Sequence, residues 1–380
     1  MPNSGKQQVH IISSDVPFPA DYGGMIDVFY TIKELSESGI EIYLHCFQYG
    51  RGSSAELEKH CEKVWYYPRK TGLPGFSLSL PYMMYSRRAE ELLPNLLINN
   101  APILFEGIHC CYLLNHPALA GRKKILRNQN VEQQYYTLLA RRTSGILRKI
   151  YFKVEALLLR RFESKLENAD ALAPISERDT LFFENLYPDK KVIHIAGFHP
   201  FEEVISKEGS GTYCLYHGNL GHPENIEVAL YLIENVFKGL EVPFIIAGRN
   251  PDQKIIDACK QNVNIQLVEN PGENAMSELI RNAHINVMPT FQESGLKLKL
   301  LYALYSGRFV LVNQSMLYGT GLDEVCVVAE NDIAFRQKIN DLMGKQFLSS
   351  DIEQRKAVLS RQYDNKEKAK RLNEIIKSQD

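Results

Sequence analysis

The sequence predicts an α/β protein made of two Rossmann-like domains, each a doubly wound parallel sheet. Three observations predict this fold class. The chain has 380 residues, which is too long for one compact α/β domain and suits two. Short apolar strands alternate with helical patterns in both halves. A glycine turn follows the first strand of each half, as in a strand–turn–helix unit that starts a parallel sheet.

The first predicted domain spans residues 1–200. It begins with the strand Val9–Ser13, the pair Gly23-Gly24 and a helical pattern that ends at Gly39, where a helix C-cap favours glycine. Three more strands and a long helical stretch, with a break at Ser144-Gly145, complete it: Ile40–Phe47, Ile103–Phe105, Val192–Ala196 and 131–167.

The second predicted domain spans residues 201–350 and starts with a polar linker at 202–211. Its first strand, Tyr213–His217, leads into the turn Gly218-Asn219-Leu220-Gly221 and then into a helix. Its further predicted strands are Pro243–Ala247, Ile265–Val268, Ile285–Met288 and Phe309–Val312. Residues 351–380 are charged and helical, which predicts a closing helix that packs back across both domains.

Net charge, cysteine spacing and the length of apolar runs indicate which partners and which cellular compartment to expect. The formal net charge of −1 offers no global attraction for nucleic acid. The seven cysteines are scattered without CxxC spacing, which indicates free thiols in a reducing compartment and no metal cage. No apolar run approaches ~20 residues, so neither a signal peptide nor a spanning helix is predicted. We therefore expect a cytoplasmic protein that carries no metal or other cofactor.

Glycines and lysines mark candidate anion sites. Gly23-Gly24 precedes a helix whose N-terminal amides could face a phosphate; the alternative is a tight turn. The turn at Gly218 lacks both the P-loop and the full dinucleotide spacing. The segment 294–303 is the most informative, since Gly295 is predicted to open a helix with Lys297 and Lys299 in its first turn. Cations there oppose the helix dipole, so they favour an anionic ligand over two solvated lysines.

Two further features have competing interpretations. His109 follows a strand end, where a histidine acts as acid, base or orienting group; the alternative is a hydrogen-bonded histidine under a loop. The basic run 141–161 is interleaved with apolar residues, which suits either anionic lipid heads or a solvated helix face. The apolar tip at 74–84 is a second candidate for membrane or acceptor contact.

Five segments together resemble a known family, the GT-B, family-4-type (group 1) glycosyltransferases, over nearly the whole chain. They occur in order and at plausible spacing: Pro19-Ala20-Asp21-Tyr22-Gly23-Gly24, Phe105-Glu106-Gly107-Ile108-His109, Arg127-Asn128-Gln129-Asn130-Val131-Glu132, Gly248-Arg249-Asn250-Pro251 and 295–303. The resemblance implies two domains that face each other across a central cleft. It also implies that the second domain binds a nucleotide-diphosphate sugar, that the first binds the acceptor, and that transfer retains configuration without a metal.

The resemblance carries roles onto particular residues. Gly23 and Gly24 would let the first domain close on the donor, and His109 would position the reacting sugar or stabilise the transition state. Lys297, a second catalytic candidate, and Lys299 would neutralise the departing phosphates. The other donor-side residues that it implies are Gly218, Arg249, Asn250, Glu293, Ser294, Gly295 and Tyr302.

The chain also departs from the family pattern. Tyr302 stands where the family has a glutamate that binds both ribose hydroxyls, and Gln129 replaces a histidine. Glu293 is the nearby carboxylate that could substitute. We therefore expect a retaining hexosyltransferase in polysaccharide or glycan biosynthesis, acting on a nucleotide sugar and an unknown acceptor, in the cytoplasm or at the inner face of the membrane. The alternatives are a degenerate GT-B binding or scaffold subunit, a GT-B sugar-nucleotide epimerase and a nicotinamide-dependent oxidoreductase.

Overall fold

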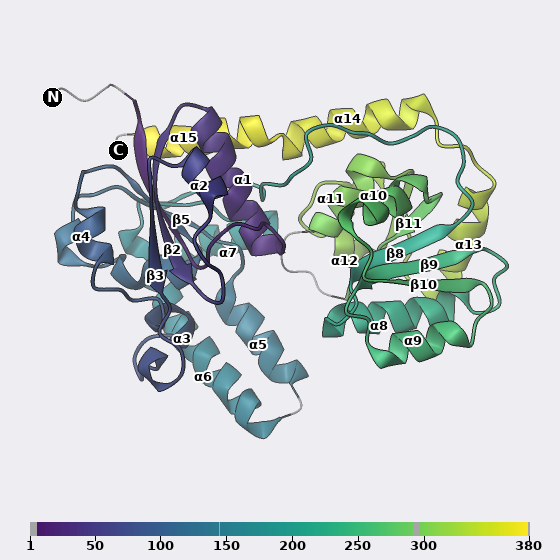
Figure 1. The fold of residues 1–380 in the computed structure, drawn as a ribbon, viewed down its shortest axis with the longest axis horizontal. Coiled ribbons are helices and arrows are strands. Elements are labelled where there is room, and N and C mark those ends of the chain that lie inside the picture. Colours follow the sequence, from purple (N-terminus) through teal and green to yellow (C-terminus); the bar gives the residue numbers. More distant parts are fainter. Residues whose placement is uncertain (1–5, 144, 292–296, 379–380) are drawn as a thin grey trace. The chain divides into compact units, whose positions relative to one another are not determined.

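The computed structural model describes residues 6–143, 145–291 and 297–378 (Figure 1). The described chain divides into two compact units. The first unit holds the residues up to Pro200 together with those from Asn365 onward, and the second holds 201–291 and 297–364. Each unit is built on one parallel sheet, as the alternation of strands and helices predicted.

The sheet of the first unit has the strand order of a Rossmann fold, β3-β2-β1-β4-β5-β6-β7, with every pairing parallel. Its strands are β1 (Gln8–Ser13), β2 (Glu41–Gln48), β3 (Lys63–Pro68), β4 (Ile103–Glu106), β5 (Lys124–Arg127), β6 (Ala171–Leu172) and β7 (Lys191–Val192). Alternate residues of β1 point to opposite faces, so Ile11 lies in one apolar cluster and Ile12 in the other. Both faces must therefore be covered by helices.

The helices of the first unit supply that cover. Helix α1 packs with α15 on one face, where Val28 and Ile32 meet Leu372 and Ile376 (Figure 1). Residues of α6 and α7, such as Phe162 and Phe183, belong to the cluster on the other face. The helices are α1 (Gly23–Glu37), α2 (Ala55–His60), α3 (Tyr82–Tyr85), α4 (Leu92–Leu96), α5 (Glu132–Arg142), α6 (Ile146–Glu163), α7 (Glu177–Leu186) and α15 (Asn365–Lys377).

The second unit repeats the plan with the order β10-β9-β8-β11-β12-β13, again all parallel. Figure 1 shows α8 and α9 on one face of this sheet and α10 and α11 on the other. Its strands are β8 (Cys214–Asn219), β9 (Phe244–Arg249), β10 (Ile265–Glu269), β11 (Ile285–Val287), β12 (Phe309–Val312) and β13 (Val327–Val328). Its helices are α8 (Pro223–Tyr231), α9 (Gln253–Lys260), α10 (Glu273–Asn282), α11 (Leu298–Ser306), α12 (Gln314–Leu317), α13 (Asp332–Met343) and α14 (Ser349–Tyr363).

Several local predictions need correction. Helix α11 begins at Leu298, with Lys297 as its N-cap, rather than at Gly295, which lies outside the described residues. The strand predicted at Val192–Ala196 is reduced to the two-residue β7, and the chain after it is irregular. The tail forms two helices, α14 and α15, which belong to different units.

The break predicted near Gly145 is confirmed, because α5 ends at Arg142 and α6 begins at Ile146. Gly39 also has the left-handed backbone, with φ 83°, that the predicted helix end requires. Within the described residues, no helix is both long and apolar enough to cross a bilayer.

Candidate functional site

The carboxyl end of the second sheet is built from loops whose backbones touch. A Cβ on Gly248 would lie 1.9 Å from the carbonyl oxygen of Gly218, so glycine is required where β8 and β9 end side by side. The amide of Leu220 donates to the Arg249 carbonyl at 2.8 Å. Asn250 has φ 51° and its amide donates to Asn270 Oδ1 at 2.8 Å. These bonds hold the two loops in one conformation.

Asn225, in the first turn of α8, links this edge to Lys299 on α11. Its side-chain amide donates to the Asn219 carbonyl at 2.9 Å, and a Cβ on Gly218 would lie 3.3 Å from that amide nitrogen. Its Oδ1 accepts hydrogen bonds from the hydroxyl of Tyr216 and from Lys299 Nζ, both at 3.1 Å. The glycine at 218 thus leaves room for the side chain that orients Lys299.

Lys299 is a partly enclosed cation in an unfavourable helix position. Its Nζ lies 5.2 Å from the centre of the Tyr216 ring. Burial lowers the pKa of Lys299, and the carboxylate of Glu224 opposes that shift. Glu224 itself accepts a hydrogen bond from the hydroxyl of Thr290. Lys299 stands in the first turn of α11, where the helix dipole disfavours cations. An anion bound there would be stabilised by the Lys299 ammonium and by the helix dipole.

His217 is a site residue that the sequence did not single out among several strand-end histidines. It is buried at the end of β8, and burial followed by the charge of Lys299 lowers its pKa to about 3. Among the described residues its Nε2 has no hydrogen-bond partner. A buried polar atom without a partner beside a cation is suited to bind a ligand atom. The signal available in the sequence was its position at the carboxyl end of the first strand of its domain.

Tyr302 lies three residues after Lys299 on α11, on the same side of the helix. Its ring is 5.1 Å from that of Phe201 and 6.0 Å from that of His217, the latter edge-on. The position that the family gives to a ribose-binding carboxylate is therefore occupied here by a ring in an aromatic cluster.

The other predicted donor-side residues separate into two groups. Arg249 is exposed at the end of β9, next to Asn250 and the Gly218 turn. Lys297 is partly buried as the N-cap of α11. Glu293, Ser294 and Gly295 lie outside the described residues. The structure thus brings Gly218, Lys299 and Tyr302 together through Asn225 and His217.

In the first unit, Gly23 and Gly24 are the first two residues of α1, whereas the sequence predicted them just before that helix. A Cβ on Gly24 would lie 2.9 Å from Gln129 Oε1, and the Gln129 amide donates to the Gly24 carbonyl at 3.3 Å. His109 lies in the short 3-10 helix Ile108–Leu113 that follows β4. Burial, and then the charges of Arg87 and Arg69, lower its pKa well below the ordinary value, so its imidazole is neutral.

A buried ion network lies beneath these segments of the first unit. Arg127 donates to both carboxylate oxygens of Asp27, each at 2.9 Å, and lies 3.7 Å from Glu106. Asp27 also accepts from the Phe198 amide at 2.6 Å. Burial raises the pKa of Glu106, with Arg127 opposing the shift and Asp27 adding to it. The sequence showed Arg127 and Glu106 only as parts of motifs, whereas the structure makes them structural partners.

Residues 211–345 match the family model described as glycosyl transferases group 1. These residues form a group 1 glycosyltransferase domain. The match covers β8 to β13 and includes Gly218, Asn225, Lys299 and Tyr302. The first unit lies outside it.

Solved structures show that the whole chain has the GT-B fold. TarM aligns with a TM-score of 0.66 at 11% identity, covering 98% of this chain and 99% of that one. Sucrose-phosphate synthase from Thermosynechococcus elongatus aligns with a TM-score of 0.66 at 12% identity, covering 97% and 98%. A further TarM structure, from S. aureus, holds alpha-GlcNAc-glycerol and UDP.

A curated protein is also similar to this chain in sequence. It is described as an uncharacterized 44.6 kDa protein in the cps region of Klebsiella pneumoniae. The two are 24% identical over 357 residues, which cover 87% of this chain and 90% of the Klebsiella protein.

Proposed function

We propose that this group 1 glycosyltransferase moves a hexose, with retention of configuration, from a nucleotide-diphosphate sugar to a glycan, lipid-linked or other acceptor. Lys299 carries the proposal, because it is a partly enclosed cation at a helix start whose hydrogen bond goes to the neutral amide of Asn225. The UDP bound by TarM supports a nucleotide diphosphate as the anion. The Klebsiella relative, a protein of the cps region, supports a role in polysaccharide biosynthesis. The proposed place of action is the cytoplasm or the inner face of the membrane.

The reaction breaks the bond between the anomeric carbon and the diphosphate and forms one to an acceptor oxygen, whose proton passes to the departing diphosphate. Negative charge collects on the departing diphosphate. Lys299 and the first amides of α11 stabilise that charge in the transition state, with no metal required. The free Nε2 of His217 binds a polar atom of the same ligand. Lys297, Arg249 and Asn250 complete the donor side.

The first unit binds the acceptor in this proposal. Gly23 and Gly24, the first residues of α1, let this unit close on the diphosphate and sugar of the donor. His109 acts as a neutral imidazole, since its lowered pKa keeps it uncharged near neutral pH. A neutral ring can accept or donate a hydrogen bond to a sugar hydroxyl without adding charge.

A thermal-shift screen with UDP and GDP tests the donor site. We expect a nucleoside diphosphate at about 100 times its Kd to stabilise the protein by about 2.7 kcal/mol. Lys299→Met should remove most of that gain, while Lys260→Met, an exposed lysine at the end of α9, should keep it. No stabilisation by any nucleoside diphosphate would contradict the proposal, and stabilisation by NAD alone would indicate an oxidoreductase.

One observation favours a second function, that of a scaffold subunit without transfer activity. Tyr302 replaces the expected carboxylate and packs against Phe201 and His217. A single phenol cannot accept hydrogen bonds from two ribose hydroxyls as a carboxylate does. Tyr302→Glu separates the two functions: tighter nucleotide binding indicates a working site with a weakened ribose contact, and no binding by either form indicates the scaffold.

A further inference from the structure

Helix α6 keeps a stripe of apolar side chains in solvent. Ile146, Ile150, Val154 and Leu157 are spaced by four, four and three residues, which places them on one side of the helix. Their exposed fractions are 70%, 51%, 43% and 55%. The opposite side of α6 packs on the core of the first unit through Leu159 and Phe162. The helix is thus apolar on its outer side as well as on its inner side.

Charges on α5 and α6 are segregated by sign. Within the described residues of α5 and α6, the three carboxylates are all buried: Glu132, Glu155 and Glu163. The five cations of α6 are exposed or partly exposed: Arg148, Lys149, Lys153, Arg160 and Arg161. The outer surface of this helix pair therefore carries positive charge without neighbouring carboxylates of its own. This local excess contrasts with the net charge of −1 for the whole chain.

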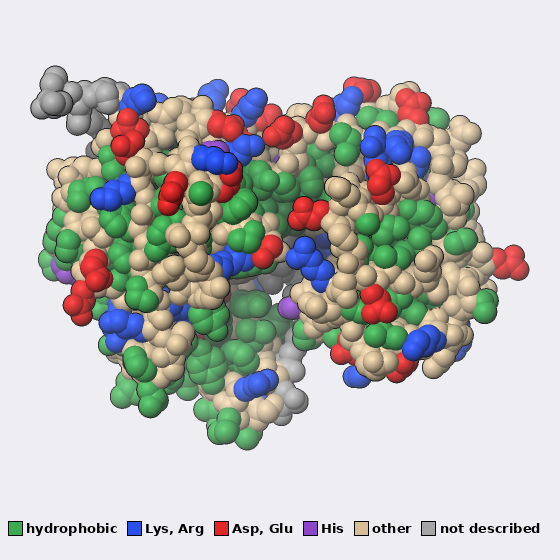
Figure 2. Space-filling view, viewed as in Figure 1, with side chains coloured by type: hydrophobic (Ala, Val, Ile, Leu, Met, Phe, Trp, Pro, Cys, Tyr) green, Lys and Arg blue, Asp and Glu red, His purple; other side chains and the backbone are tan. Residues whose placement is uncertain are grey.

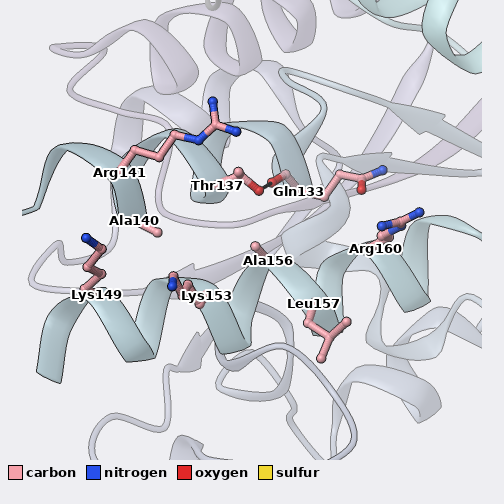
Figure 3. Close-up of a pocket in the computed structure, with 9 residues that line it drawn as sticks. All are labelled: Gln133, Thr137, Ala140, Arg141, Lys149, Lys153, Ala156, Leu157 and Arg160. Atoms are coloured by element: carbon pink, nitrogen blue, oxygen red, sulfur yellow. Dashed lines mark hydrogen bonds between the residues drawn. The ribbon is translucent and has the colours of Figure 1, made fainter. Parts of the chain in front are cut away.

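A groove between α5 and α6 collects four of the cations beside the apolar stripe. It has a volume of about 580 Å³, and Gln133, Thr137, Ala140 and Ala156 form its floor and sides. Arg141 on α5 and Lys149, Lys153 and Arg160 on α6 line it, and Figure 3 shows the end of the Arg141 side chain directed away from α6. Among the described residues that line it there is no carboxylate. A groove of this composition fits phosphate groups.

A second apolar element is attached to α6. The loop 71–80 contains no charged residue, and its Leu73 and Leu78 are 90% and 91% exposed. The Gly72 amide donates to the Tyr82 hydroxyl at 3.1 Å, and the Tyr82 amide donates to Glu155 at 2.9 Å. The exposed leucines are therefore held in place next to α6. Figure 2 shows hydrophobic side chains gathered at this end of the first unit, over α3 and α6.

We propose that this docking surface, the apolar stripe of α6, the groove cations and the 71–80 loop, binds the surface of an anionic lipid bilayer. The apolar side chains enter the boundary between headgroups and acyl chains, and the four groove cations hold lipid phosphates. Exposed apolar side chains flanked by cations have this combined affinity, whereas either set alone binds membranes weakly. The inference rests on the proposed function in one respect only: a lipid-linked acceptor would give the protein a reason to bind a membrane.

Vesicle co-sedimentation of the full chain, without nucleotide or sugar, tests the docking surface independently of transfer. We expect binding to vesicles of phosphatidylglycerol and phosphatidylcholine, and little binding to phosphatidylcholine alone. Raising the salt concentration should weaken the binding, because ions screen the lysine and arginine charges. A failure of sugar transfer would not affect this measurement, and a failure to bind vesicles would leave the donor-site proposal intact.

Two variants divide the contributions. Lys149→Glu/Lys153→Glu should lower the partition coefficient by about 25-fold or more, since each lysine near an anionic surface contributes about 1 kcal/mol, or a factor of about five. Lys260→Glu/Lys345→Glu makes the same change of net charge on exposed residues of the second unit and should bind as wild type. Ile150→Ser/Leu157→Ser should lose most binding, whereas Leu181→Ser, exposed on α7, should not.

Three results would overturn the inference. The first is equal binding of wild type to both kinds of vesicle or to neither. The second is unchanged binding by both docking-surface variants. The third is a wild-type dimer in lipid-free sedimentation that Ile150→Ser/Leu157→Ser converts to monomer, which would show that the stripe is an interface between copies of the chain.

Discussion

Arg127 in the first unit and Lys299 in the second are both cations shielded from solvent near the carboxyl ends of parallel strands, but they differ in their hydrogen-bond partners. Arg127 is fully buried and has two hydrogen bonds from its guanidinium to the carboxylate of Asp27. Lys299 is partly exposed and its hydrogen bond goes to the amide oxygen of Asn225. A cation that is hydrogen-bonded to a carboxylate inside the protein stabilises the fold, and one whose hydrogen bond goes to a neutral amide remains available to an anionic ligand.

The difference in partners also indicates different roles for two residues that both lie in family-like motifs. Arg127 belongs to a segment through which the chain resembles glycosyltransferases, but its contacts are all to the interior of the first unit. Lys299 belongs to another of the segments through which the chain resembles glycosyltransferases, and it borders the loops at the end of the second sheet. The following substitutions test whether these two cations have the separate roles that their partners indicate.

The largest expected effect is on stability, from Arg127→Met. Removing this guanidinium leaves the Asp27 carboxylate buried without the counter-charge to which it is hydrogen-bonded, which typically costs about 3–5 kcal/mol. Chemical denaturation should show that loss in the free energy of unfolding. Arg371→Met, an exposed arginine on α15, is the matched control and should change it by less than about 1 kcal/mol. Equal effects of the two substitutions would contradict a structural role for Arg127.

Lys299→Met should act on transfer rather than on stability. Loss of one fixed donor to developing negative charge typically costs about 3 kcal/mol, or about 100-fold in kcat/KM for the donor. The free energy of unfolding should stay near wild type or rise, because a lysine whose pKa is lowered by burial gains nothing from that burial. A strongly destabilised protein with normal turnover would reverse the assignment.

Glu106→Gln tests whether Arg127 is balanced by one carboxylate or two. Burial raises the folded pKa of Glu106 above its ordinary 4.5, so the folded state holds that proton more tightly than the unfolded state. Wild type should lose stability as pH rises above 4.5 towards that raised pKa, by at most about 1.4 kcal/mol per pH unit for this proton. The glutamine variant lacks this loss, so its stability relative to wild type should increase with pH. Parallel pH profiles of the free energy of unfolding would contradict this.

The smallest effect is expected from Asn225→Asp, which gives Lys299 a carboxylate like the one that Arg127 has. The new ion pair should compete with an anionic ligand and weaken nucleoside diphosphate binding by roughly tenfold. It also removes the hydrogen bond that the Asn225 amide donates to the Asn219 carbonyl, because a carboxylate cannot donate. Since the new ion pair offsets this loss, the free energy of unfolding should change by less than about 1 kcal/mol. Titration calorimetry with UDP measures the first effect, and unchanged affinity would mean that Lys299 does not face the ligand.

Local patterns in the chain were sufficient for most of the fold. Apolar strands alternating with amphipathic helices predicted two doubly wound parallel sheets, and the glycine turns marked the first strand of each. The strands β3 and β5, of six and four residues, and the two-residue strands β6, β7 and β13 were missed or misplaced. A strand of two residues has too little periodicity to be recognised, and its neighbours in the sheet define it.

What the sequence by itself determined is the type of the two sheets, the family likeness and the segments that hold candidate residues, because these depend on local spacing and residue type. Only the tertiary structure decided which of those residues act together. Lys299 meets Asn225 from 74 positions away, and Arg127 meets Asp27 from 100 positions away. Whether a buried charge is matched depends on such distant contacts, and no local pattern along the chain records them.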